Sequence, residues 1–172
     1  MAHPSHEQVR RRYQHRCGYC GVSEAEAGGE LTVDHYRPSA SGGSDEDENL
    51  VYACSRCNQY KRDFFPTAEE LSRGWRVLHP LRDDVAAHIR VNDLTGNAEP
   101  LGETGRFHIA LLQLNRPALV QQRLRRRLAA LIAEKQRLLE AENLQLRATI
   151  AAQETYITHL RRLLGLPIGD NL

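Results

Sequence analysis

The stretch CGYCGVSEAEAGGELTVDHYRPSASGGSDEDENLVYACSRCNQYKR, residues 17–62, contains all four cysteines of the chain. They form two pairs, Cys17 with Cys20 and Cys54 with Cys57, each separated by two residues. This spacing allows a tight turn in which both sulfurs point inward, so two such pairs can make one tetrahedral zinc site. The alternatives are two disulfides, a single redox-active pair, or four unrelated buried thiols.

The surroundings of the cysteines favour zinc over these alternatives. Residues 1–16 are polar and basic without an apolar run, so neither a secretory signal nor an oxidising compartment is indicated. A redox site needs one CxxC and usually lies in a βαβ pattern, which is absent here. We therefore expect all four cysteines to hold one structural Zn²⁺.

Composition sets few limits on function. The 172 residues carry a net charge of +1, which fits one modest domain or a small domain with an appendage. There is no run of about 20 apolar residues, so we expect no membrane span and a soluble cytoplasmic protein. The charges are segregated, however: basic residues gather at 10–16 and 116–127, and acidic residues at 45–48. Each basic run is typical either of a solvated helix face or of contact with nucleic-acid phosphates.

The residues between the cysteine pairs predict a strand, a loop and a second strand. Residues 31–33 alternate as a short strand that runs into Asp34 and His35, residues 39–48 form a turn-rich loop, and residues 50–53 form the second strand. A helix follows from Cys57, with Asn58, Lys61 and Arg62 on one face. Consecutive side chains of a strand face opposite sides, so we expect the strand to break at Asp34 and His35 if both serve one site.

The motifs CGYC, VDHYRP, SGGSDEDENL and CSRCNQYK, in this order, resemble the HNH endonuclease family in its zinc-stapled branch. The resemblance implies a ββα-metal fold that holds one catalytic divalent cation. It makes Asp34 and Asn58 ligands of that ion, His35 the general base, and Asn49 the residue that fixes the loop and orients His35. A carboxylate and an amide oxygen suit Mg²⁺ or Mn²⁺, and histidine can act as a base near neutral pH.

These observations together predict a metal-dependent DNA endonuclease in which one ion assists phosphodiester hydrolysis. We expect nucleic-acid contacts from five basic residues: Arg37, Lys61, Arg62, Arg123 and Arg126. The main alternative is a non-catalytic, zinc-stabilised nucleic-acid-binding module with a coiled-coil oligomerisation arm. A coiled-coil adaptor that the zinc module merely caps, and RNA as the substrate, also remain open.

The rest of the chain predicts a connecting layer and a long helix. Residues 1–66 would form the nuclease module, and residues 67–115 an α/β layer packed on it, because so small a zinc module buries little core by itself. In residues 116–172, Pro117 suits a first helical turn, and no glycine or proline follows until Gly165. The fold class is thus α+β: a small zinc-stapled ββα-metal module, a helical connecting layer and a long C-terminal helix.

The long helix carries an imperfect coiled-coil pattern. Its apolar residues fall mostly at heptad-like steps, interrupted by Lys135, Glu142 and Gln153 and by an extra step near Ile150. An exposed apolar stripe needs a partner, and we expect a homodimer through this helix. A helical hairpin or docking onto a different protein would satisfy the same stripe.

Overall fold

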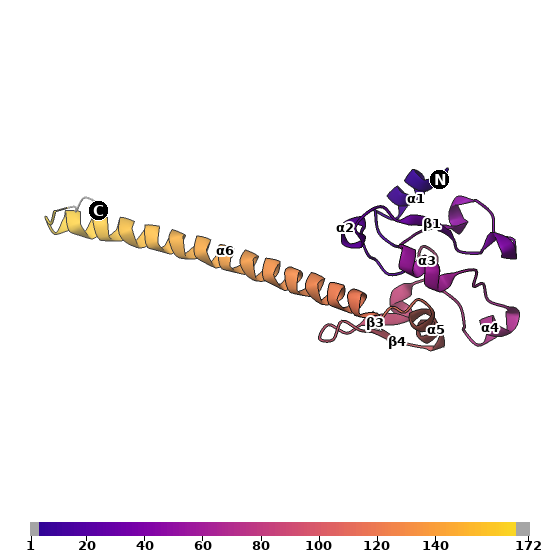
Figure 1. Ribbon diagram of the computed structural model, residues 1–172. Helices are drawn as coiled ribbons and strands as arrows, with labels where there is room; N and C mark the ends of the chain where they lie inside the picture. Colours follow the sequence, from indigo (N-terminus) through magenta and orange to yellow (C-terminus); the bar gives the residue numbers. More distant parts are fainter. Residues whose placement is uncertain (1–3, 168–172) are drawn as a thin grey trace. The chain divides into compact units, whose positions relative to one another are not determined.

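Within residues 4–167, which the computed structural model describes, the chain forms six α-helices and two antiparallel two-stranded sheets (Figure 1). It divides into two compact units, Met1–Arg125 and Arg126–Leu172. The expected α+β class, with small sheets, mixed helices and a long C-terminal helix, is confirmed.

The first sheet and the helix after it form the predicted ββα unit. Strand β1 (Thr32–His35) pairs antiparallel with β2 (Leu50–Ala53), and the register places Thr32 opposite Ala53 and His35 opposite Leu50. Helix α3 (Ser55–Lys61) begins directly after β2. Every residue of β2 is fully buried, which explains its uninterrupted apolar sequence, since a strand covered on both faces does not alternate.

Helix α1 (His6–Arg12) closes one side of this unit through the buried Val9. It ends at Arg12, four residues before Arg16. Gln14 and His15 adopt left-handed φ values of 51° and 60°, which an α-helix does not accommodate. The Arg-rich run is therefore split between the helix and the turn after it.

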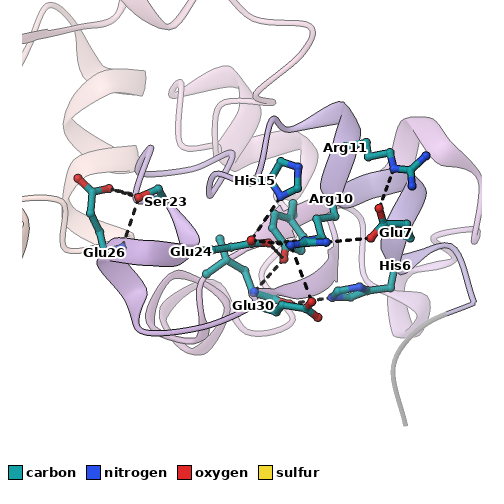
Figure 2. A network of polar contacts seen from close by, with 11 residues as sticks. His6, Glu7, Arg10, Arg11, His15, Ser23, Glu24, Glu26 and Glu30 are labelled. Carbon is teal, nitrogen blue, oxygen red and sulfur yellow. Dashed lines mark hydrogen bonds and ion pairs between the residues drawn. The ribbon is translucent and has the colours of Figure 1, made fainter.

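The arginines of α1 form internal ion pairs. Arg10 donates to both carboxylate oxygens of Glu24 at 2.6 and 2.8 Å (Figure 2), and Glu24 opens the short helix α2 (Glu24–Ala27). Glu24 also accepts a 2.5 Å hydrogen bond from Tyr52 Oη. Arg11 pairs with Glu7, and Arg12 pairs with Asp47. This part of the basic run thus joins α1, α2 and β2.

The connecting layer consists of α4 (Ala68–Ser72), the 3-10 turn η3 (Val85–Ala87), the hairpin of β3 (Ile89–Val91) and β4 (Ala98–Pro100), and α5 (Glu103–Leu111). Helix α4 begins with a capping box between Thr67 and Glu70. Helix α5 lies so close to the segment before β3 that a Cβ on Gly105 would fall 2.0 Å from the His88 carbonyl oxygen. Only glycine fits there.

Several contacts join the connecting layer to the ββα unit. Tyr36 Oη donates to the Val77 carbonyl at 2.7 Å, and the rings of Phe64 and Phe107 lie 5.1 Å apart. These contacts supply core that the short ββα unit cannot bury alone.

Helix α6 (Pro117–Leu163) begins at the predicted proline and runs for 47 residues, about 70 Å at 1.5 Å per residue. Beyond Arg125 it exposes a series of large apolar side chains. No helix in the described part of the chain is both long and apolar enough to cross a membrane.

The Arg10–Glu24 pair makes stability depend on pH in a defined direction. The Arg10 guanidinium, followed by the Tyr52 hydroxyl, lowers the pKa of Glu24 from 4.5 to about 2. A lowered folded-state pKa contributes stability above the unfolded-state pKa, and that stability is lost as the pH falls through the folded-state value.

We therefore expect Glu24→Gln to lower the free energy of unfolding by a constant amount between pH 6 and 8, in urea titrations. The difference from the native protein should shrink as the pH falls from 4.5 towards 2. Glu30→Gln is the matched control, because the Glu30 carboxylate interacts more weakly with Arg10: it lies 3.8 Å away and is largely exposed. An equal loss in both variants would contradict the assignment.

Candidate functional site

The four cysteines converge on one point between the turn after α1, the end of β2 and the start of α3. All are free thiols, and their sulfur atoms lie within 4.8 Å of one another. Cys20 Sγ and Cys54 Sγ are 3.8 Å apart, which is about the edge of a tetrahedron with 2.3 Å zinc–sulfur bonds. The donor set therefore fits a closed Zn²⁺ site, and the sulfurs are too far apart for disulfides.

The Arg116 guanidinium lies beside these sulfurs. Its Nη2 lies 3.8 Å from Cys20 Sγ, 3.8 Å from Cys54 Sγ and 3.6 Å from Cys57 Sγ. Four thiolates and one Zn²⁺ carry a net charge of −2, so a half-buried guanidinium offsets part of that charge. The sequence showed Arg116 only as a member of a basic run.

A cavity of about 310 Å³ lies beside α3. Four of the predicted site residues line it: Asp34, His35, Asn58 and Arg62. Asp34 and His35 come from β1, Asn58 from α3, and Arg62 from the turn that follows. The ββα unit thus brings together residues from two segments separated by the whole intervening loop.

Asp34 is buried and held by two partners. Tyr19 Oη donates to Asp34 Oδ2 at 2.7 Å, and Lys61 Nζ lies 3.2 Å from the same oxygen. Burial raises the pKa of Asp34, and the Lys61 ammonium opposes this rise. The two contacts leave carboxylate lone pairs available, since an ionised carboxylate offers about four acceptor sites.

The expected break of the strand at Asp34 and His35 is wrong. Both residues belong to β1 and keep their pairing with Val51 and Leu50. Their side chains alternate as a pleated strand requires: Asp34 meets Lys61 of α3, and His35 meets the loop. Both nevertheless line the same cavity, because it lies at the end of the strand, next to the turn of residues 38–40.

His35 has a carboxylate partner that the sequence reading missed. Its Nε2 lies 2.6 Å from Asp45 Oδ1, and the His35 side chain is 24% exposed. A carboxylate can only accept here, so Nε2 carries the hydrogen and, in the neutral ring, Nδ1 carries the lone pair. The acidic run at residues 45–48 was a signal for this contact.

A comparison with known families bears on this geometry. Residues 17–64 match the family model described as HNH endonuclease. The chain contains an HNH domain. Its four clustered cysteines fit the zinc-stapled branch of that family. No curated protein and no solved structure gives a significant match to the chain.

Asn49 fixes the loop of the HNH domain from outside the cavity. Its Oδ1 accepts from Arg37 N at 2.8 Å, and its Nδ2 donates to the carbonyls of Arg37 and Ser44 at 3.0 and 2.8 Å. Gly43 permits the close approach of the two loop ends, because a Cβ there would lie 1.8 Å from the Arg37 carbonyl oxygen. Through this loop, Asn49 holds the segment that bears Asp45.

The predicted basic contacts differ in their surroundings. Lys61 is 1% exposed and donates to the His35 carbonyl at 2.6 Å, so its charge serves the interior. Arg62 is exposed and has left α3, with φ of 51°, which corrects the expectation that it shares a helical face with Lys61. Arg37 is exposed beside Phe65. Arg123 donates to the Gly96 carbonyl at 3.1 Å, and Arg126 belongs to the second unit.

For the HNH domain we predict one zinc ion per chain by elemental analysis of the purified protein. Cys57→Ser should reduce the zinc content well below one, because a structural site needs all four ligands. Since zinc binding is coupled to folding, the melting temperature should fall by about 10 °C or more.

Ser55→Ala is the matched control, since Ser55 is an exposed neighbour in the same turn. Its zinc content and melting temperature should equal those of the native protein. Full zinc occupancy in Cys57→Ser, or a disulfide found by mass spectrometry, would contradict the assignment.

Proposed function

We propose that the HNH domain is a metal-dependent endonuclease that hydrolyses phosphodiester bonds of DNA. The observation that carries the proposal is the cavity lined by Asp34, His35 and Asn58, within a segment that matches the HNH model. A carboxylate and an amide at one cavity can hold a divalent ion, and an imidazole beside them can act as the general base, which suits metal-assisted hydrolysis of a phosphodiester.

Asp34 and Asn58 would hold Mg²⁺ or Mn²⁺. Their oxygens are hard ligands of the kind these ions prefer. The Asn58 side chain donates one hydrogen bond among the described residues, from Nδ2 to Thr32 Oγ1 at 3.5 Å, which leaves its amide oxygen available to a ligand. When bound, the ion supplies positive charge to the phosphate and the leaving oxygen.

Two buried groups would keep Asp34 ready for this role. Tyr19 donates to one carboxylate oxygen, and Lys61 lies within 3.4 Å of both. The Lys61 ammonium opposes the effect of burial and favours the ionised carboxylate. Lys61 would therefore position Asp34, and the exposed Arg62 and Arg37 would contact the substrate phosphate.

His35 would act as the general base. The Asp45 carboxylate accepts from Nε2–H at 2.6 Å, which keeps the lone pair on Nδ1, where it can take a proton from water. The partner of one imidazole nitrogen determines which nitrogen can act as the base. Asn49 supports this arrangement indirectly, since it fixes the loop that carries Asp45.

We expect His35→Ala to reduce the nicking of supercoiled plasmid by at least about 100-fold in Mg²⁺ or Mn²⁺, the usual contribution of a general base. Zinc content and melting temperature should stay near the native values, because His35 is half-buried at the surface. Gel quantification of nicked and linear plasmid measures the rate and the number of strands cut.

His159→Ala is the control, because His159 is exposed on the long helix. Equal cleavage by His35→Ala would refute the assignment. A native protein that holds zinc and binds DNA, but cleaves with neither ion, would instead indicate a non-catalytic nucleic-acid-binding module. Single-stranded DNA and RNA substrates separate the substrate classes.

We also expect Asp45→Asn to slow cleavage by about 10-fold. This is the smallest loss usually seen when a partner that orients a functional histidine is removed. DNA binding should be unchanged. ¹⁵N NMR should report hydrogen on Nε2 of the native His35 and a changed tautomer ratio in the variant. Glu48→Gln, which removes a charge from the same acidic run, should leave both readouts at native values. A slow variant with the native tautomer would contradict the role given to Asp45.

A further inference from the structure

The second unit exposes an apolar stripe along α6. Five of its residues are each about half exposed: Leu128 at 58%, Ile132 at 50%, Leu139 at 47%, Leu146 at 54% and Ile150 at 53%. They lie three or four positions apart once Lys135 and Glu142 are included in the line, so all seven share one face of the helix. An apolar face of this kind on a helix is normally buried against another part of the protein or a partner.

The order of these seven residues is self-complementary. From residue 128 to residue 150 the stripe reads Leu, Ile, Lys, Leu, Glu, Leu, Ile, with Leu139 at its centre. When a second copy of the stripe is placed antiparallel to the first, with the two Leu139 residues aligned, every apolar residue faces an apolar residue of the other copy. Lys135 and Glu142, the two charged positions, exchange places.

We infer that two copies of the chain pair through α6 as an antiparallel two-helix coil centred on Leu139. In this register Leu128 packs on the partner's Ile150, and Ile132 packs on the partner's Leu146. Lys135 meets the partner's Glu142 twice, once on each side of the twofold axis. Leu131 and Leu138, which are 45% and 66% exposed, widen the buried surface on one side.

The two charged residues select this arrangement over its competitors. A parallel pair in register would place Lys135 against Lys135 and Glu142 against Glu142, and like charges that face each other destabilise a helix pair. An antiparallel pair centred on Leu146 would place Lys135 against Ile157 and Glu142 against Ile150. That register leaves charges on apolar partners, which costs desolvation without an ion pair.

The same pattern explains the polar interruptions of the heptads. In the antiparallel pair, Lys135 and Glu142 act as specificity residues, since they penalise other registers and orientations. The pairing involves only residues of the second unit, so it is independent of the proposed nuclease activity.

The test uses the full-length, zinc-loaded protein in analytical ultracentrifugation at low salt. We expect a dimer for the native chain. Lys135→Glu alone, or Glu142→Lys alone, should weaken the dimer about 10-fold or more, because each replaces two ion pairs by two like-charge contacts. The double variant, with both substitutions, should restore the native dissociation constant.

A parallel dimer would not show this weakening and recovery of the dissociation constant, because its like-charge contacts persist in the single and double variants alike. Arg137→Glu and Glu140→Lys, which change charges off the stripe, are the matched controls. Native affinity in the single variants, no recovery in the double variant, or a native monomer would overturn the inference.

A second measurement does not depend on affinity. Leu128→Cys chains mixed with Ile150→Cys chains should cross-link to each other with a short bismaleimide, and neither should cross-link efficiently to itself. Efficient self-cross-linking of Leu128→Cys would show a parallel pair and overturn the inference.

Discussion

The convergence of four sulfur atoms on one point is the constraint on which the rest of the HNH domain depends. Cys17 and Cys20 belong to the turn after α1, whereas Cys54 and Cys57 belong to the junction of β2 and α3. One ion held by all four would tie these segments together. The position of α3, and with it that of Asn58 and Lys61, follows from this junction. A domain of this size can therefore dispense with a large core.

The interior of the domain also contains an unusual pair of charges. Lys61 and Asp34 are both almost completely buried, and a buried ion pair stabilises a fold only when its geometry and remaining hydrogen bonds are good. Here the ammonium also reaches the His35 carbonyl, and the carboxylate also accepts from Tyr19. The pair fixes β1 against α3 beside Asp34 and His35, the two residues that the proposed chemistry uses. The desolvation cost of burying two charges therefore falls at a position with a proposed function.

The sequence predicted what depends on local pattern. The two CxxC pairs, the ββα order and the start of the long helix at Pro117 all follow from short-range spacing, and the structure contains each of them. The environment of Lys61 could not be predicted in the same way, because helical periodicity gives a face but not what covers it. Tyr19 and Arg116 were missed for a related reason: their partners lie far along the chain. The strand was expected to break because Asp34 and His35 were both expected to serve one site, whereas both residues line a cavity at the strand end without a break.

Arg116 links the cysteine cluster to the start of the long helix within the first unit. It contacts three cysteine sulfurs and immediately precedes Pro117, the first residue of α6. When the ion is bound, the negative charge of the thiolate cluster holds this guanidinium in place; when the thiolates lose the ion and take up protons, that attraction disappears. Metal occupancy and the anchoring of the first turn of the long helix are therefore thermodynamically linked. A zinc ion at this site would thus act as an electrostatic clamp on the first turn of α6 as well as a staple within the domain.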